Sequence, residues 1–180
     1  MAGRVSLRPV TSDDLALFEK EFSSEQGTGA YQWFGFTPMH KLLRQFSENG
    51  LLGPDGGVLT VVADNDEPVG RVEWFKSAWG RPETSVCWTI AIGLRPQFQG
   101  RGIGTEAQRQ LIRYLFWHTR AERIQAYTDV DNKAEQRALE KAGFSREGVL
   151  RSAQWRQGGW HDQVLYSILR GSVPVAAGPG

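Results

Sequence analysis

Glycines at alternate positions form a short run that could bind an anion. The run is Gln99-Gly100-Arg101-Gly102-Ile103-Gly104, and a helical pattern of apolar residues follows it from Thr105 to about His118. The first backbone N–H groups of a helix lack partners within the helix, and they converge at the positive end of the helix dipole. Glycines beside them let a bulky phosphate approach closely. The run therefore predicts a phosphate-binding turn, with a connector that binds nothing as the alternative.

Two common phosphate motifs fit this turn less well. A P-loop needs Gly-x-x-x-x-Gly-Lys-Ser/Thr, and no lysine precedes Thr105. Residues 102–107 match the Gly-x-Gly-x-x-Ala fingerprint of dinucleotide-binding proteins. That fingerprint belongs to the first βα unit of a parallel sheet, with an acid about 20 residues later. Here a hairpin pattern precedes the turn and the acids come later, at Asp129 and Asp131, so the dinucleotide interpretation is the less favoured alternative.

The composition describes one ordinary globular domain. The chain has 180 residues, of which 40% are hydrophobic and 23% are charged, with a net charge of +1. This balance gives no field that would hold nucleic acid or an anionic membrane, and no window reaches the ~18 apolar residues of a membrane helix. The single cysteine excludes an internal disulfide, and the three histidines are too scattered to indicate a metal site. We expect a cytoplasmic protein without a metal.

Strand and helix patterns surround the glycine-rich turn. Strand-like alternation occurs at residues 5–8, 57–63, 69–75, 85–94, 123–130, 144–151 and 161–169. Helical spacing occurs from a capping box at residues 11–14 to about residue 24, from Pro38, from Thr105 and from residue 132 to 142. In the strand at 85–94, one face carries only the small residues Cys87, Thr89, Ala91 and Gly93, which lets something approach the backbone. We expect one domain over residues 1–170 and a disordered tail at 171–180.

An aromatic loop lies between the first two predicted helices. Residues 27–36 follow neither the strand nor the helix period, and they include Tyr31, Trp33, Phe34 and Phe36. So many rings between flanking glycines favour the rim or lid of a pocket over core packing. Trp79 is a further candidate for the same wall.

Further motifs follow one another between residues 5 and 170. Asn132 to Phe144 contain an asparagine followed by Glu-Lys-x-Gly-Phe, and the chain opens with Leu7-Arg8-Pro9 and Asp14-Leu15 and closes with residues 147–151, Trp160-His161-Asp162 and Tyr166-Ser167. Together with the glycine run, which resembles a [Gln/Arg]-x-x-Gly-x-[Gly/Ala] pyrophosphate loop, these motifs resemble the GNAT superfamily of acyl-CoA-dependent N-acetyltransferases. The closing motifs are similar to its RimJ/RimL-like branch.

The resemblance implies an α/β fold of the α+β type. A mixed, mostly antiparallel sheet of six or seven strands would be flanked by four helices, and its fourth and fifth strands would splay apart into an acyl-CoA cleft. The residues implied to bind acetyl-CoA are Ile92 and Leu94 at the pantetheine, Gln99, Gly100, Arg101, Gly102, Ile103, Gly104 and Thr105 at the pyrophosphate, and Asn132 from the later helix. Asn132 also has Glu135 three residues on, so helix capping alone explains it equally simply.

The implied activity is direct transfer of an acetyl group to a primary amine. The backbone N–H near Ile92 would stabilise the oxyanion. The family's usual tyrosine is absent from residues 138–141, and the branch's usual serine is Glu135, so no acid is assigned. The family's strand carboxylate is Thr89 here. Glu73 is the candidate base, with Glu83, Asp129 and a water relay as alternatives.

Three further points stay open. The acceptor is either the amine of a small molecule or a protein N-terminus, and the aromatic loop leans toward the small molecule. The absent tyrosine, serine and carboxylate also fit a non-catalytic acyl-CoA-binding regulatory module. The resemblance also implies that the partner can be a second copy of this chain, because homodimers are common in the family. Cys87, mid-strand and without a nearby histidine, is interpreted as a buried inert thiol rather than a nucleophile.

Overall fold

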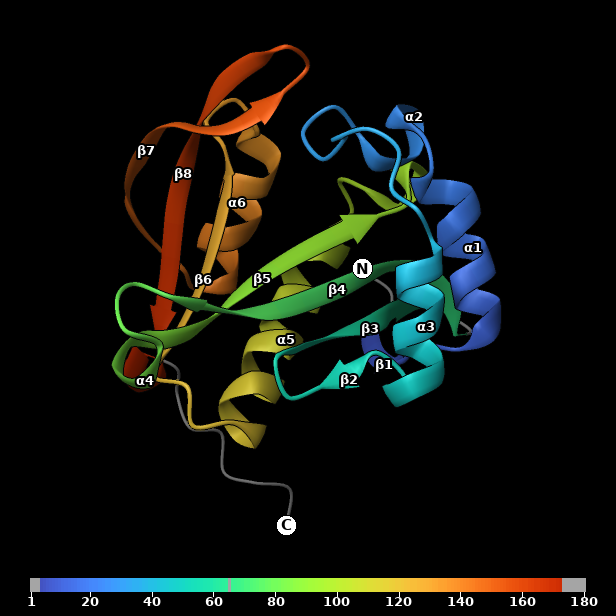
Figure 1. The fold of residues 1–180 in the computed structure, drawn as a ribbon, viewed down its shortest axis with the longest axis horizontal. Helices are drawn as coiled ribbons and strands as arrows, with labels where there is room; N and C mark the ends of the chain where they lie inside the picture. The colour runs from blue at the N-terminus through green and yellow to red at the C-terminus, as the bar shows by residue number, and fades with distance from the viewer. Residues whose placement is uncertain (1–3, 65, 173–180) are drawn as a thin grey trace.

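The computed structural model describes residues 4–64 and 66–172, which form one twisted sheet covered by helices (Figure 1). The strands are β1 (Ser6–Pro9), β2 (Leu52–Gly53), β3 (Gly56–Ala63), β4 (Glu67–Ala78), β5 (Val86–Leu94), β6 (Arg123–Asp129), β7 (Ser145–Arg156) and β8 (Gly159–Leu169). The α-helices are α1 (Ser12–Phe22), α2 (Glu25–Thr28), α3 (His40–Asn49), α4 (Pro82–Ser85), α5 (Ile103–His118) and α6 (Lys133–Ala142). Short 3-10 helices occupy Pro96–Phe98 and Arg170–Ser172. None of the described helices is long and apolar enough to cross a membrane.

The strand order is β1-β3-β4-β5-β6-β8-β7, with the two-residue β2 paired to β3. Every neighbouring pair is antiparallel except β5 and β6, which are parallel and joined by the crossover helix α5. The predicted mixed, mostly antiparallel sheet is confirmed. Four helices were expected and α1, α3, α5 and α6 fill those places, while the sequence patterns missed the single-turn helices α2 and α4.

The β5–β6 pair is the feature that shapes the site. Only Trp88 with Ile124 and Thr89 with Gln125 are in register. Beyond these positions the two strands diverge, and Figure 1 shows β5 running away from the plane of β6 and β8. The predicted splaying of the two strands is therefore confirmed, and it opens a gap on the carboxyl side of both.

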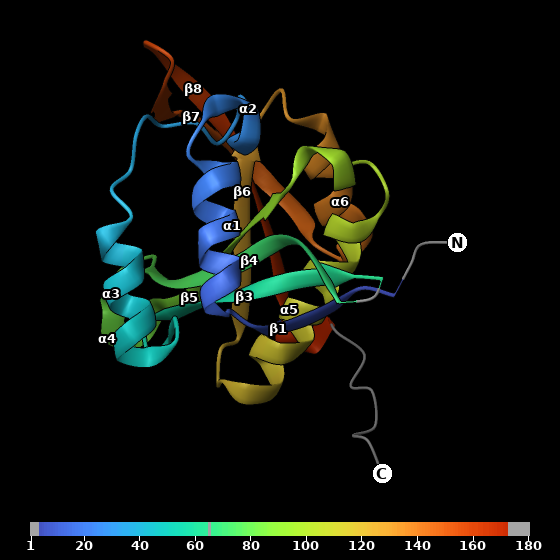
Figure 2. The same ribbon diagram turned by 90° about the vertical axis from the view of Figure 1, so that its right-hand side faces the viewer.

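Two apolar clusters cover the two faces of the sheet. The larger one joins α5 to the central strands, and its most buried members include Ala107, Leu111, Val72 and Ile124. The smaller one lies under α1, where Leu15 and Phe18 pack with Leu51, and the partly buried Leu42 and Phe46 of α3 pack against it. Figure 2 shows α1 and α3 on one side of the sheet and α5 and α6 on the other.

A buried carboxylate ties α1 to the sheet. Asp14 completes the predicted capping box with Thr11. Its Oδ2 also accepts from Arg8 at 2.5 Å and from Thr60 at 2.9 Å. Burial opposes ionisation of this carboxyl, but Arg8 and the Thr11 and Thr60 hydrogen bonds hold its pKa below the ordinary value. Helix α1 is thereby fixed against β1 and β3.

Several boundaries differ from the sequence patterns. The first strand was expected at residues 5–8 but runs from Ser6 to Pro9, and the helix expected from Pro38 begins at His40. Strand β4 continues to Ala78 because that residue pairs with Val86 of β5. Gly171 and Ser172 lie in a 3-10 turn rather than a tail. The rest of the predicted tail, 173–180, lies outside the described residues.

Candidate active site

The glycine-rich turn ends in a helix start that no side chain caps. Gly100 and Gly102 have φ angles of 72° and 79°, in the left-handed region that glycine adopts without strain. Gly102 is the N-cap of α5, and the first bond of the helix runs from Glu106 N–H to its carbonyl. The N–H groups of Ile103, Gly104 and Thr105 therefore lie at the open end of a 16-residue helix, where an anion would be stabilised.

Strand β5 has one edge free beyond its contact with β6. The Arg95 N–H donates to Val69 of the β4 side, and backbone groups alternate along an antiparallel strand, so Ala91 and Gly93 also face β4. Ile92 and Leu94 face the gap. Their carbonyls accept from side chains instead of a strand, Ile92 from Gln32 Nε2 at 2.8 Å and Leu94 from Gln99 Nε2 at 3.0 Å. Their N–H groups thus point into the gap.

A cavity of about 570 Å³ occupies this gap. The residues of β4 and β5 that line it include Arg71, Glu73, Phe75, Ala91 and Gly93. Their neighbours Val72, Trp74 and Ile90 belong to the larger apolar cluster on the opposite face. Three of the four residues of the predicted small-residue face, Thr89, Ala91 and Gly93, thus line a cavity large enough for a small-molecule site, and Cys87 does not.

The aromatic loop forms a wall of the cavity. Its four predicted wall residues, Tyr31, Trp33, Phe34 and Phe36, all line the cavity. Trp79 does not line it. The Trp79 indole donates to Gln125 Oε1 at 2.7 Å near the place where β5 and β6 pair, and 57% of the residue is exposed.

The match to a known family covers most of the chain. Residues 4–145 match the family model described as Acetyltransferase (GNAT) domain. The chain belongs to this family.

Individual GNAT proteins are similar over different lengths. A "Probable N-acetyltransferase YjcK" of Bacillus subtilis is 34% identical over 113 residues, which cover 63% of this chain and 60% of that protein. Among solved structures, Mycobacterium smegmatis RimJ in complex with CoA-disulfide has a TM-score of 0.78 at 22% identity, covering 97% of this chain and 86% of that one. Spermidine N-acetyltransferase from Vibrio cholerae, in complex with CoA and spermine, has a TM-score of 0.78 at 18% identity, covering 93% and 96%. The expected GNAT fold is confirmed.

Of the residues expected to bind the GNAT cofactor, Ile92 and Asn132 line the cavity, whereas Leu94 and residues 99–105 do not. Ile92 and Leu94 present their N–H groups from β5, and residues 99–105 form the turn and first turn of α5. Asn132 lines the cavity from the start of α6, where its Oδ1 also accepts from Glu135 N–H at 3.2 Å. The capping interpretation of Asn132 is therefore correct, and its place in the cavity keeps cofactor contact as a prediction.

The carboxylates considered as bases have different surroundings. Glu73 is half-buried, lines the cavity and lies opposite Ala91 in the β4–β5 register. Glu83 is exposed on α4 and does not line the cavity. Asp129 lines it, but its pKa is held below the ordinary value, against its burial, by the Asp131 N–H and by Arg156. A low pKa makes Asp129 a weak proton acceptor, so Glu73 keeps the better position.

Two positions predicted to lack a catalytic role have structural partners. Thr89 is buried, and its Oγ1 accepts from Gln125 Nε2 at 3.0 Å and lies 2.7 Å from Ser77 Oγ. Cys87 is 1% exposed, and burial raises the pKa of its thiol. Both observations agree with a tightly packed junction between β4, β5 and β6, and a thiol held neutral is a poor nucleophile.

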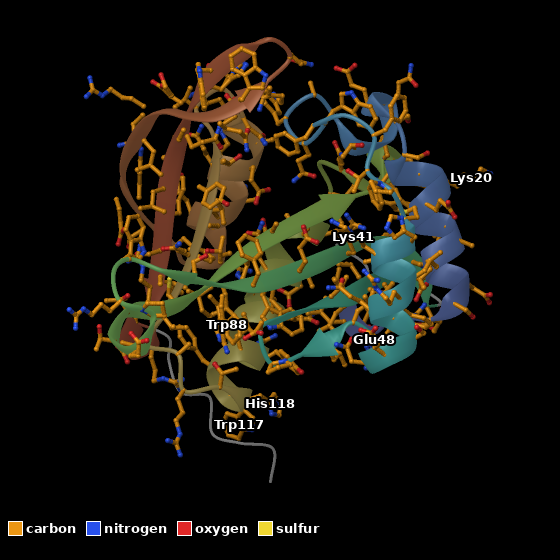
Figure 3. The ribbon with its side chains drawn as sticks, in the orientation of Figure 1. Lys20, Lys41, Glu48, Trp88, Trp117 and His118 are labelled. Atoms are coloured by element: carbon orange, nitrogen blue, oxygen red, sulfur yellow. The ribbon has the colours of Figure 1, made fainter. Side chains whose placement is uncertain are left out.

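The histidines occupy three separate places. His40 begins α3, and His161 lies on β8. His118 ends α5 beside Trp117, away from the cleft (Figure 3), with its ring 4.8 Å from that of Tyr114. The described part of the chain contains no group of three or more His, Cys, Asp or Glu side chains placed to hold a metal ion.

Sequence patterns missed two residues of the site. Gln32 binds the free edge of β5, and Arg156 lies 2.7 Å from Asp129 in a buried ion pair. Both contacts join segments far apart in the chain. Gln32 lies among conspicuous aromatic residues and Arg156 precedes a Gln-Gly-Gly turn, so neither position carries a local signal.

Proposed function

We propose that the protein is an N-acetyltransferase that transfers the acetyl group of acetyl-CoA directly to a primary amine, and that its acceptor is a small molecule. The observation that carries the proposal is that two sets of backbone N–H groups without hydrogen-bond partners lie close together. The free N–H groups of Ile92 and Leu94 face the gap, and Gly104 in the uncapped first turn of α5 lies beside the Ile92 and Leu94 side chains. Membership of the GNAT family and the CoA-bound relatives support the same ligand.

Each part of acetyl-CoA would have a chemically suited partner. The α5 N–H groups, with no competing side-chain cap, suit the pyrophosphate. The free edge of β5 suits the amides of the pantetheine arm, which need a donor and an acceptor in an extended arrangement. Asn132, at the opposite wall, has a side-chain N–H₂ group that its capping bond leaves free to donate. These assignments are carried over from the family's motifs onto matching positions.

The acetyl transfer needs few side chains. The amine nitrogen would attack the thioester carbonyl, and the Ile92 N–H would donate to the carbonyl oxygen as it becomes negative. Glu73 would accept the amine proton, directly or through water. The carbon–sulfur bond would break, and the thiolate would take a proton from solvent. No acid is assigned to this step.

The small-molecule acceptor is favoured by the covering of the cavity. The segment with Tyr31, Trp33, Phe34 and Phe36 lies over the gap and contributes rings to the lining. A protein N-terminus needs an open groove along which several residues can lie. An amine-bearing compound needs a cavity of the kind seen here, of about 570 Å³ with a few polar groups among rings.

The first test is cofactor binding by thermal denaturation with acetyl-CoA, NAD and ATP in parallel. A ligand at about 100 times its dissociation constant adds about 2.7 kcal/mol to the free energy of unfolding, which raises the Tm of a domain this size by about 5–10 °C. We expect this rise with acetyl-CoA alone. A rise with NAD alone, or with none of the three, would refute the proposal.

The second test is turnover. Thiol release from acetyl-CoA is followed with a thiol-reactive dye against a panel of small amines and N-terminal peptides. We expect amine-dependent release with small amines and a loss of kcat in Glu73→Gln without loss of acetyl-CoA binding. Binding without release for any amine would favour the non-catalytic module, and release with peptides alone would overturn the acceptor class.

A further inference from the structure

A short segment crosses the gap between the two parts of the sheet. We call residues 29–36 the strap. Its consecutive residues Tyr31 and Gln32 attach to opposite sides. Gln32 Nε2 donates to Ile92 O of β5 at 2.8 Å. The Tyr31 hydroxyl donates to Asp131 O, in the turn that follows β6, at 3.2 Å. The strap is therefore held on both sides of the cavity that it covers.

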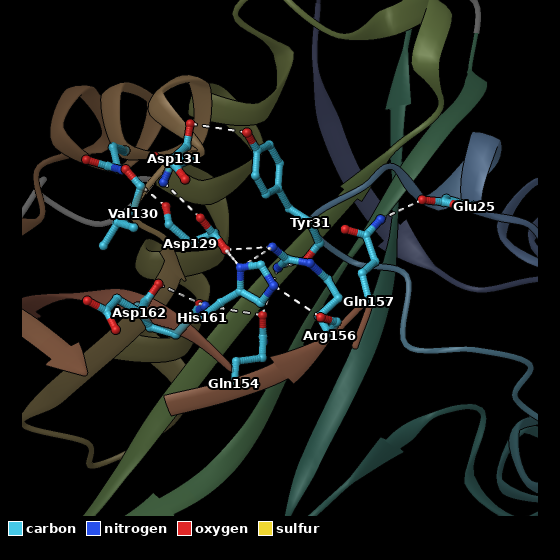
Figure 4. A network of polar contacts seen from close by, with 12 residues as sticks. Glu25, Tyr31, Asp129, Val130, Asp131, Gln154, Arg156, Gln157, His161 and Asp162 are labelled. Carbon is cyan, nitrogen blue, oxygen red and sulfur yellow. Dashed lines mark hydrogen bonds and ion pairs between the residues drawn. The ribbon is translucent and has the colours of Figure 1, made fainter. Parts of the chain in front are cut away.

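Arg156 makes most of the contacts on the β6 side (Figure 4). One of its amino groups, Nη2, lies 2.7 Å from Asp129 Oδ2. The other, Nη1, donates to Tyr31 O at 3.3 Å and to Gln154 Oε1 at 3.1 Å. The guanidinium carbon also lies 5.4 Å from the centre of the Tyr31 ring, within cation–π range. A single side chain thus connects a buried carboxylate to the strap.

The orientation of this guanidinium is informative. Arg156 is 4% exposed, and its Nε is buried without a hydrogen-bond partner. An unpaired buried donor is costly. If Arg156 only had to balance the charge of Asp129, its Nε and one amino group could both face the carboxylate, as in a forked arginine–carboxylate pair. Here the guanidinium instead presents Nη1 to Tyr31 O and Gln154 Oε1 and its face to the Tyr31 ring, so contacts other than the one with Asp129 account for the orientation.

His161 supports the same orientation. Its Nε2 lies 3.1 Å from Arg156 O, and a carbonyl only accepts, so Nε2 is the donor. Its Nδ1 then accepts from Arg156 Nη2 at 3.3 Å. Both amino groups of Arg156 are thereby occupied, one by Asp129 and His161 and the other by Tyr31 of the strap and Gln154.

We propose that Arg156 is a positioning residue for the acceptor wall: by holding Tyr31 it keeps the strap closed over the cavity and so sets the affinity for the amine. That this wall binds the amine acceptor rests on the proposed function. The closing of the strap over the cavity is a separate property. Lysine could neutralise Asp129, but its single ammonium cannot also bind Tyr31 O and stack on the ring. The arginine is therefore required for positioning rather than for charge alone.

The decisive experiment is limited digestion with chymotrypsin, which cleaves after aromatic residues, with the cleavage sites mapped by mass spectrometry. Trp33 is half-buried, so cleavage after Trp33 reports opening of the strap, whereas the Phe34 and Phe36 side chains are exposed already. We expect cleavage after Trp33 to be about tenfold faster in Arg156→Lys and in Tyr31→Ala, because loss of a charge-assisted hydrogen bond shifts a local opening equilibrium by that factor. Tyr31→Ala keeps the Asp129–Arg156 pair, so it separates the strap from the buried charge.

A matched control is available at the other end of the molecule. Arg170 donates to the carbonyls of Phe116, Thr119 and Ala121 and stacks on the Phe116 ring, with a carbon-to-centroid distance of 5.1 Å. Arg170→Lys loses the same kinds of contact far from the strap, and strap cleavage should not change. Unchanged strap cleavage in both test variants, or cleavage that rises equally throughout the chain, would overturn the proposal.

Kinetics then connect the strap to the acceptor. With an amine that the wild type acetylates, we expect Arg156→Lys and Tyr31→Ala to raise the KM for the amine about tenfold while the KM for acetyl-CoA changes by less than about twofold. A fall in kcat with both KM values unchanged would contradict a positioning role. A wild type that fails to bind acetyl-CoA refutes the proposed function instead, and the digestion result still decides whether Arg156 holds the strap.

Discussion

Glu135 is the carboxyl group whose surroundings most strongly favour its neutral form. It lies in the first turn of α6, where its Oε1 accepts from Gln108 Nε2 at 2.5 Å. Burial raises its pKa from 4.5 to about 7, despite the opposing effect of the Gln108 hydrogen bond. The Gln108 Oε1 is buried without a partner. Replacing Glu135 by glutamine would remove the charge and supply an amide N–H that can donate to this oxygen.

The sign of the effect follows from the direction of the pKa change. The folded protein holds the Glu135 proton more tightly than the unfolded chain, so the stability that this provides is complete below pH 4.5. It is lost as the pH rises to about 7, where the folded state must also bury a charge. Each tenfold change in proton affinity corresponds to about 1.4 kcal/mol, so the total loss is at most about 3 kcal/mol.

The assay is urea unfolding of wild type and Glu135→Gln at several values between pH 4.5 and pH 8. The difference in the free energy of unfolding between the two proteins isolates Glu135, because all other groups titrate in both. We expect little difference at the acid end and a variant more stable by up to about 3 kcal/mol at the alkaline end. The exposed Glu83→Gln should stay within about 0.5 kcal/mol throughout. Equal stability of Glu135→Gln and wild type at pH 8 would refute the reasoning.

Three further substitutions test other parts of the structure. Gly102→Ala puts a side chain into a left-handed conformation with open space around it, so the free energy of unfolding should fall by about 1 kcal/mol. Calorimetry should also show weaker acetyl-CoA binding. Unchanged stability and unchanged binding would contradict the role of the turn. Leu111→Ala should cost about 2–5 kcal/mol in urea unfolding because the side chain is fully buried in the larger cluster, and a cost below about 1 kcal/mol would contradict that packing. Arg123, with help from Ser167, lowers the pKa of Glu147 to about 2 against its partial burial, so its stabilisation is lost as the pH falls from about 4.5 toward 2. Because this pair is partly exposed, Glu147→Gln should cost at most about 1 kcal/mol at pH 7 and nothing near pH 2, and a pH-independent cost would contradict the ion pair.

The sequence predicted what local patterns encode. The α1 capping box, the Asn132 cap of α6 and the glycine turn before α5 each depend on residues within one turn, and each is present in the structure. The small-residue face of β5 likewise follows from strict alternation, and it borders the cavity. The mostly antiparallel sheet and its splayed pair of strands came from resemblance to GNAT proteins, because strand pairing is set by contacts distant in sequence.

The parts that were missed depend on long-range contacts. Arg156 and Tyr31 are 125 residues apart, and only the fold brings them together. Trp79 was grouped with the strap rings by residue type, but its indole is bound to Gln125 of β6, outside the cavity lining. The single-turn helices α2 and α4 are too short for a periodic pattern to show them.

The two-pair junction of β5 with β6 has a consequence for amide hydrogen exchange. Along the last part of β5, the N–H groups of Ala91 and Gly93 are bonded to β4, whereas those of Ile92 and Leu94 face the gap. A strand in the middle of a sheet normally exchanges slowly at every residue. Here amide exchange should alternate, slow at Ala91 and Gly93 and fast at Ile92 and Leu94. The exchange rates of these four consecutive residues would therefore show how far along β5 the gap extends.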